Sequence, residues 1–234
     1  MTPRAKAISR GAKNPDVWIV IPLYNEAPVI GSVIDDLKAV FSNVVCIDDG
    51  SSDGSGAIAK AHGARVINHP INLGQGAALQ TGISYAREQA GAKYIVTFDA
   101  DGQHRIDDAL GMLELARSKN LGVVFGSRFL DDRTNPGFAK KVVLKTAVWV
   151  TNQTTGMKLT DAHNGLRVLS VEAAKGINLQ QDRMAHATEI VVQIGRTKLP
   201  WEEFPVEVIY TDYSKAKGQS LLNSVNILFD LIVN

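Results

Sequence analysis

Two aspartates separated by one residue follow an apolar segment near the middle of the chain. Residues 93–98 (KYIVTF) lead directly into Asp99-Ala100-Asp101. Two carboxylates at this spacing can converge on a hard divalent cation such as Mg²⁺ or Mn²⁺, which prefers oxygen ligands and can bridge to a diphosphate. Such a cation acts as a Lewis acid and stabilises a leaving nucleoside diphosphate. Taken alone, the pair could form a surface turn that begins a helix, so the interpretation depends on the other polar segments.

Several further polar segments each follow an apolar run. They are residues 22–26 (PLYNE), 48–55 (DDGSSDGS), 72–76 (NLGQG) and 126–128 (GSR). Ligands of an open parallel α/β sheet bind beyond the carboxyl ends of its strands, so five such segments predict one shared site and favour metal binding at Asp99 and Asp101. A glycine-rich turn with Asp53 capping the next helix explains much of 48–55. It does not explain two adjacent carboxylates, so one of Asp48 and Asp49 is a candidate acceptor for a base N–H.

Alternating strands and helices must position these segments. We expect strands at 16–21, 43–47, 64–68, 93–98 and 121–125, with helices at 28–41, 53–62, 76–89 and 107–119. This alternation predicts βαβ units and a largely parallel sheet with helices on both faces. In the second half we expect helices at 138–154, 185–198 and 221–233, and strands at 165–170 and 204–211. Without a linker or repeat, the prediction is one α/β domain.

Bulk composition excludes several classes of protein. The chain has 234 residues, a formal net charge of +1 and a single cysteine, Cys46. This charge gives no field for a nucleic-acid partner, and one cysteine permits no internal disulfide. No segment approaches the roughly 20 apolar residues that span a bilayer. We expect a flexible tail at 1–15, a domain at 16–234, and a cytoplasmic protein, either free or at the cytoplasmic face of a membrane.

The polar segments, in their order, resemble those of family 2 glycosyltransferases. The shared blocks are P-x-Y-N-E, D-D-G-S-x-D-G, N-x-G-x-x-x-A, D-A-D-G-Q-H and G-S-R. The most similar subgroup contains dolichol-phosphate mannosyltransferase and the bacterial polyprenyl-phosphate glycosyltransferases, and the resemblance extends over residues 16–220. It implies a GT-A fold, a single Rossmann-like domain with a mostly parallel central sheet flanked by helices. It also implies metal-dependent, inverting transfer from a nucleoside-diphosphate sugar, with 16–128 as the donor half and 129–234 as the acceptor half.

The resemblance assigns roles to particular residues. The donor would be bound by Pro22, Tyr24, Glu26, Asp49, Asn72, Gly74, Asp99 and Asp101. Mg²⁺ or Mn²⁺ would be held by Asp99, Asp101 and Gln103. The acceptor phosphate would face Arg128, Arg167 and Lys215, because guanidinium groups suit bidentate phosphate binding. Alternatives from the residues alone are a surface salt bridge for Arg128 and a structural role for Arg167. Asp101, Arg128 and Asp161 are the candidate catalytic residues, with Asp161 as a base or an orienting group.

Two departures from the family pattern concern the acceptor. The usual G-F-R is Gly165-Leu166-Arg167, and the usual basic run near the C-terminus keeps Lys215 but lacks an arginine. The acceptor is therefore a polyprenyl phosphate or, alternatively, a sugar hydroxyl of a glycan. A lipid phosphate is already anionic and needs no strong base. The common E-D base motif is absent, and its nearest counterpart, Glu189, has no following Asp, which favours the phosphate.

Two predicted helices could contact a membrane. The helix at 138–154 carries Lys140, Lys141, Lys145 and Trp149. The terminal helix at 221–233 is amphipathic, and it could lie in a bilayer interface, pack on the core or pair two subunits. A solvated charged face is an equal alternative for the first helix. Of the histidines, His62, His69 and His186 are expected to be structural, whereas His104 and His163 fall in the candidate site loops. A non-catalytic nucleotide-sugar-binding module is the non-enzyme alternative, against which the intact Asp-x-Asp argues.

Overall fold

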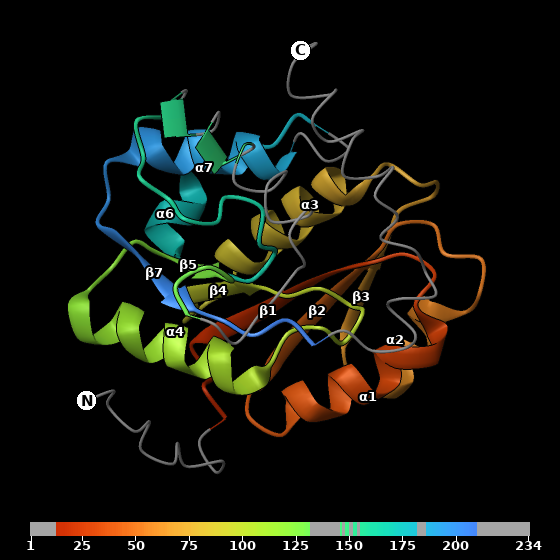
Figure 1. Ribbon diagram of the computed structural model, residues 1–234. Helices are drawn as coiled ribbons and strands as arrows, with labels where there is room; N and C mark the ends of the chain where they lie inside the picture. Colours follow the sequence, from red (N-terminus) through yellow and green to blue (C-terminus); the bar gives the residue numbers. More distant parts are fainter. Residues whose placement is uncertain are drawn as a thin grey trace.

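The computed structural model is a single α/β domain built on a seven-stranded sheet (Figure 1). It describes residues 13–131, 146, 148–149, 152–153, 155–181 and 186–209. The strands are β1 (Val17–Leu23), β2 (Asn43–Asp48), β3 (Arg65–Asn68), β4 (Tyr94–Thr97), β5 (Val123–Ser127), β6 (Arg167–Ser170) and β7 (Trp201–Pro205). Their order across the sheet is β3-β2-β1-β4-β6-β5-β7. The predicted fold class, α/β with a mostly parallel sheet, is confirmed.

One strand runs against the others. β6 pairs antiparallel with both β4 and β5, whereas the remaining neighbours pair in parallel. Because β6 is reversed, its first residue, Arg167, lies opposite Thr97 at the end of β4. The loop that precedes β6 therefore reaches the same sheet edge as the loops that follow the parallel strands.

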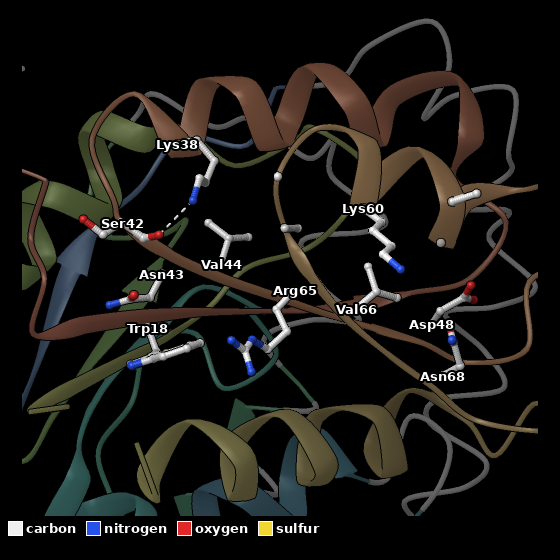
Figure 2. Close-up of a pocket in the computed structure, with 14 residues that line it drawn as sticks. Trp18, Lys38, Ser42, Asn43, Val44, Asp48, Lys60, Arg65, Val66 and Asn68 are labelled. Carbon is white, nitrogen blue, oxygen red and sulfur yellow. Dashed lines mark hydrogen bonds between the residues drawn. The ribbon is translucent and has the colours of Figure 1, made fainter. Parts of the chain in front are cut away.

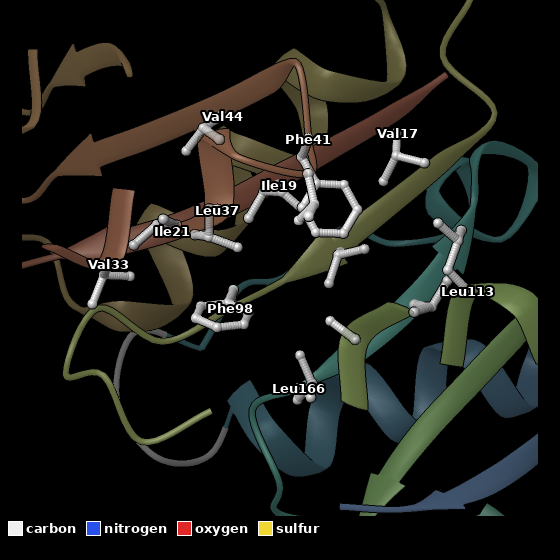
Figure 3. Packing of buried hydrophobic residues seen from close by; sticks show 14 of the residues in the cluster. Val17, Ile19, Ile21, Val33, Leu37, Phe41, Val44, Phe98, Leu113 and Leu166 are labelled. Carbon is white, nitrogen blue, oxygen red and sulfur yellow. The ribbon is translucent and has the colours of Figure 1, made fainter. Parts of the chain in front are cut away.

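Helices cover both faces of the sheet. They are α1 (Ala27–Lys38), α2 (Ser55–Ala61), α3 (Gln75–Arg87), α4 (Ile106–Lys119), α6 (Val171–Lys175) and α7 (His186–Thr197). α1, α2 and α4 lie on one face, and α3, α6 and α7 on the other (Figure 1). Side chains alternate across β1, so Val17, Ile19 and Ile21 pack against α1 and α4, as Figure 3 shows, while Val20 joins the opposite cluster. Strands buried on both faces explain the continuous apolar runs.

Part of the second half differs from expectation. The strand expected at 204–211 lies at Trp201–Pro205 instead, and the short helix α6 was not expected. After Pro205 the chain leaves the sheet, because Glu207 N donates to Asp108 Oδ2 at 2.8 Å and Ile209 N donates to Gln103 O at 2.9 Å.

Some expectations lie outside the described residues. This group contains two segments, the expected terminal helix at 221–233 and the expected tail apart from its last three residues. It also contains Lys140, Lys141, Lys145 and Lys215. Of the helix expected at 138–154, the described residues 146, 148, 149, 152 and 153 are helical. In the part of the chain that the structure describes, no helix has the length and apolar character needed to cross a membrane.

Candidate active site

A cavity of about 460 Å³ opens beyond the carboxyl ends of β1, β2 and β4. Every residue predicted on the donor side lines it: Pro22, Tyr24, Glu26, Asp49, Asn72, Gly74, Asp99 and Asp101. The second half of the chain adds His163, Gly165, Arg167, His186 and Ala187. The reversed β6 explains this convergence, because the loop before it ends at the same sheet edge. Gln103, Arg128 and Asp161 do not line this cavity.

Asp49 shapes the side of the cavity that is predicted to hold the nucleoside. Its Oδ1 accepts from Leu73 N at 2.9 Å, its Oδ2 accepts from Gly74 N at 2.8 Å, and His69 Nδ1 lies 2.7 Å from Oδ1. The other ring nitrogen of His69 lies 3.0 Å from Thr81 Oγ1. The buried carboxylate thus fixes the loop that carries Asn72 and Gly74. A carboxylate has about four acceptor positions, so Asp49 keeps capacity for one further donor, such as a base N–H.

Asp48 faces away from the cavity. It lines a separate hollow of about 670 Å³ beside β3, shown in Figure 2, whose labelled residues include Lys38, Lys60 and Arg65. Its Oδ1 accepts from Ser51 N at 2.9 Å, which closes the turn after β2. Of the two adjacent carboxylates, Asp49 is therefore the one that lines the cavity.

Asp53 joins the starts of two helices. Its Oδ2 accepts from Ala27 N at 3.0 Å, at the beginning of α1, and its Oδ1 accepts from Ser55 N at 3.0 Å, at the beginning of α2. The N-cap residue of α2 is Gly54 rather than Asp53. The capping expectation is therefore shifted by one residue, and Asp53 links the loop after β1 to the loop after β2.

The Asp99-Ala100-Asp101 segment carries unequal carboxylates. Burial opposes ionisation of Asp99, but His104, whose Nε2 lies 2.8 Å from Asp99 Oδ2, and Arg167 hold the pKa of Asp99 below its usual range. Burial and the neighbouring Asp99 raise the pKa of Asp101 to about 6. The backbone of Gly165 packs directly on Asp99, and a Cβ at this position would lie 2.8 Å from Asp99 Oδ1.

These carboxylates fit a divalent cation. Asp99 opposes ionisation of the neighbouring Asp101, and a positive charge beside the two carboxylates would relieve this repulsion. Within the described ranges, no group of three or more His, Cys, Asp and Glu side chains is arranged to hold a metal ion. Asp99 and Asp101 would then supply the protein's carboxylate oxygens, and diphosphate and water the other ligands, as Mg²⁺ sites usually have them. Gln103, the third predicted ligand, is buried, and its backbone N donates to Asp101 Oδ1 at 3.0 Å.

Arg128 and Asp161 form a buried bidentate ion pair. Arg128 Nε and Nη2 donate to the two carboxylate oxygens of Asp161 at 2.6 and 2.8 Å. Burial alone would raise the pKa of Asp161, but the Arg128 guanidinium holds it below its usual range. Glu203 on β7 accepts from Asp161 N at 3.1 Å and supports the same turn. A carboxylate so engaged suits an orienting role better than that of a base.

Arg167 is a buried cation that lines the cavity. Its side chain is 2% exposed, and its Nη2 donates to Ala162 O across 3.4 Å. Its Nε has no hydrogen-bond partner among the described residues. Burial lowers the pKa of Arg167 to about 10, although Asp99 and Asp161 favour its charge. The guanidinium remains protonated at neutral pH and can meet an anionic ligand in the cavity.

The structure changes the roles expected for some residues and adds others. His186 and Ala187, at the start of α7, line the cavity, although His186 was expected to be only structural. Glu189, the nearest counterpart of a base motif, accepts from Gln180 N and Gln181 N at 3.0 and 2.9 Å and does not line the cavity. The sequence assigned no role to Glu203. It holds the turn at Asp161 through a hydrogen bond from Asp161 N, and burial raises its pKa.

Comparison with known proteins agrees with this arrangement. Residues 18–177 match the family model of glycosyl transferase family 2. The chain is 35% identical to an uncharacterized protein of Methanocaldococcus jannaschii, over 93% of this chain and 91% of that protein. It is 30% identical to the UDP-N-acetylglucosamine–dolichyl-phosphate N-acetylglucosaminyltransferase of Methanococcus voltae, over 93% of this chain and 95% of that enzyme.

A solved structure shares the fold. Glucosyl-3-phosphoglycerate synthase of Mycobacterium tuberculosis, crystallised with Mn²⁺, UDP-glucose and phosphoglyceric acid, superposes with a TM-score of 0.63 and 16% identity. The match covers 93% of this chain and 80% of that one. This likeness confirms the predicted GT-A architecture.

Proposed function

The chain belongs to glycosyl transferase family 2, and we propose that it transfers a sugar, with inversion, from a nucleoside-diphosphate sugar to a polyprenyl phosphate. The acceptor class is supported by the Methanococcus voltae relative, whose name records transfer to dolichyl phosphate. One observation carries the proposal. The buried Arg167 cation lies in the same cavity as Asp99 and Asp101, so a single space offers both a cation-binding and an anion-binding side.

The donor would occupy the side of the cavity built around Asp49. The loop that Asp49 fixes presents Asn72 and Gly74 to the nucleoside, and Asp49 keeps one acceptor position for a base N–H. Asp99 and Asp101 would hold Mg²⁺ or Mn²⁺ beside the diphosphate. The bound cation supplies Lewis-acid stabilisation of the departing nucleoside diphosphate.

The acceptor phosphate would lie on the Arg167 side. A buried guanidinium with unused donors binds phosphate oxygens strongly and directionally. A phosphate oxygen is already anionic near neutral pH, so catalysis can rest on positioning and charge stabilisation rather than on a strong base. A reaction that needs no strong base agrees with the ion pair between Arg128 and Asp161, because this pair occupies the carboxylate that could otherwise act as a base. In this proposal Arg128 and Asp161 orient the acceptor loop, and Lys215, outside the described residues, adds charge near the acceptor.

The proposal extends to the organisation of the chain. Residues 16–128 would form the donor half and residues 129–234 the acceptor half. Because the proposed acceptor is a lipid, the reaction would take place at the cytoplasmic face of a membrane. The segments that we propose for peripheral membrane contact are the basic stretch 138–154 and the amphipathic stretch 221–233, each expected from the sequence to be helical. We propose the second stretch also for self-association.

A donor panel tests the proposal. Release of nucleoside diphosphate would be measured from UDP- and GDP-sugars with Mn²⁺ or Mg²⁺, with and without a polyprenyl phosphate. We expect turnover of one donor that depends on both the cation and the lipid phosphate. Turnover supported instead by a sugar acceptor would redirect the acceptor assignment to a glycan hydroxyl. Nucleoside-diphosphate binding without any turnover would indicate a binding module and would refute the enzyme proposal.

A further inference from the structure

His163 lies in the wall of the cavity and has unused hydrogen-bonding capacity. It belongs to the loop between Asp161 and β6. Both of its ring nitrogens are buried, and neither has a hydrogen-bond partner among the described residues. Buried polar atoms are almost always paired in folded proteins, so each unpaired one requires an explanation. A ligand in the adjoining cavity can provide the missing partners.

The imidazole of His163 is uncharged at neutral pH. Burial lowers its pKa to about 4; Asp161 favours the charged form, whereas Arg167, Arg128 and His186 oppose it. A neutral imidazole has one N–H donor and one acceptor nitrogen. The side chain therefore offers one hydrogen bond of each kind.

The hydrogen-bond donor and hydrogen-bond acceptor of the His163 ring distinguish among the ligands that the cavity could hold. Phosphate oxygens accept hydrogen bonds, so a phosphate would leave the acceptor nitrogen of His163 unpaired. A metal ion would use one nitrogen, whereas a metal-bound histidine normally donates its other N–H to a protein group, and His163 has no such partner. A hydroxyl group both donates and accepts, so neighbouring sugar hydroxyls can satisfy both nitrogens.

The position of His163 agrees with a sugar ligand. Two residues later, Gly165 packs on Asp99, and Gly165 O accepts from Thr97 Oγ1 at 2.6 Å. The His163 loop is thereby fixed against the predicted metal and diphosphate side of the cavity. Arg167, the proposed acceptor-phosphate ligand, lines the same cavity. The transferred sugar must lie where donor and acceptor meet.

We propose that His163 determines donor specificity by hydrogen-bonding to hydroxyl groups of the transferred sugar. The inference rests on the proposed function, because it requires a nucleotide-sugar donor in this cavity. It concerns a residue to which neither the family motifs nor the comparisons assign a role.

The test compares His163→Leu and His163→Gln with the wild type. Each protein would be assayed for kcat/KM with UDP-glucose, UDP-galactose, UDP-N-acetylglucosamine, UDP-N-acetylgalactosamine and GDP-mannose, under conditions that support wild-type turnover. Binding of the free nucleoside diphosphate would be measured by calorimetry. His62→Leu serves as the matched control, because His62 is 37% exposed and pairs with Asp35 outside the cavity.

We expect His163→Leu to reduce the discrimination between the best donor and its epimer by about tenfold or more, the effect of losing hydrogen bonds to a substrate hydroxyl. His163→Gln retains a hydrogen-bond donor and a hydrogen-bond acceptor, so it should recover part of the discrimination between the two sugars. Nucleoside-diphosphate affinity and the melting temperature should stay near wild-type values, whereas a purely structural role predicts a lower melting temperature and unchanged discrimination.

Two failures can be told apart. If the wild type turns over a donor and His163→Leu discriminates between donors as the wild type does, the sugar assignment of His163 is wrong and the proposed function stands. If the wild type turns over no nucleotide sugar with any acceptor, the proposed function and this inference fail together.

Discussion

Replacing Asp161 by Asn tests whether the Arg128–Asp161 pair is primarily structural. The substitution keeps the size of the side chain but removes the charge that faces Arg128 through contacts of 2.6 and 2.8 Å. The Asp161 side chain is 0% exposed and that of Arg128 is 12% exposed, so the remaining guanidinium would be largely buried without its counterion. Breaking such a buried pair typically costs about 3–5 kcal/mol, which corresponds to roughly 6–20 °C in melting temperature for a domain of this size.

Calorimetric unfolding of wild type, Asp161→Asn and an Arg128→Leu/Asp161→Leu double variant measures this cost. The double variant should be more stable than Asp161→Asn, because removing both charges leaves neither unpaired. The folded-state pKa of Asp161 is lowered, so its contribution is present above the usual pKa of 3.8 and disappears as the pH falls through the folded-state value. The difference in unfolding free energy between wild type and Asp161→Asn should therefore become smaller as the pH falls below 3.8. An Asp161→Asn protein that melts within about 2 °C of wild type but has lost transfer would refute this reasoning and make the carboxylate catalytic.

Three further predictions concern the cavity. Asp101→Asn should abolish nucleoside-diphosphate release. Between pH 3.8 and about 6 the folded state binds the Asp101 proton more tightly than the unfolded state does, so without metal the free energy of unfolding of the wild type should fall as the pH rises through this range. The variant should lack this pH dependence. A fully active Asp101→Asn would exclude the metal assignment. Arg167→Met should abolish transfer to lipid phosphate, because it removes the buried cation that lines the cavity beside Asp99 and Asp101; unchanged transfer would refute the acceptor-phosphate assignment of Arg167. Gly165→Ala, whose Cβ would lie 2.8 Å from Asp99 Oδ1, should lower kcat by about 10²-fold in the same release assay, and unchanged kcat would show that the Asp99 position is not critical.

The sheet could be predicted where apolar runs and helical periods dominate. β1, β2, β4 and β5 are buried, and their expected ranges agree with the structure to within two residues. β7 was misplaced because its residues are all only half-buried, so Trp201–Pro205 shows no apolar run. The alternation at 204–211 came instead from residues such as Val208, which forms an isolated bridge with His104. The reversal of β6 depends on tertiary pairing that local periodicity does not contain.

The site was predictable to a different extent on its two sides. The donor-side residues lie at the end of a parallel strand or after it, so their meeting in one cavity follows from strand direction. The pairing of Arg128 with Asp161 joins residues 33 positions apart, and the support from Glu203 comes from a further strand. No spacing rule relates such residues. The unpaired nitrogens of His163 are likewise a property of packing, which only the folded structure shows.

The reversed strand also constrains the order of folding. The sheet β3-β2-β1-β4 can form from the first 97 residues, but the outer edge of β4 pairs with β6, and β5 pairs with β6 and β7. During synthesis, which proceeds from the N-terminus, β5 emerges before either of its partner strands, and the β4 edge stays open until residues 167–170 arrive. Arg167 enters the cavity in the same pairing event. Covering of the β4 edge and placement of Arg167 in the cavity thus depend on the same strand pairing, and a nascent chain that stops short of residue 167 exposes an edge open to aggregation.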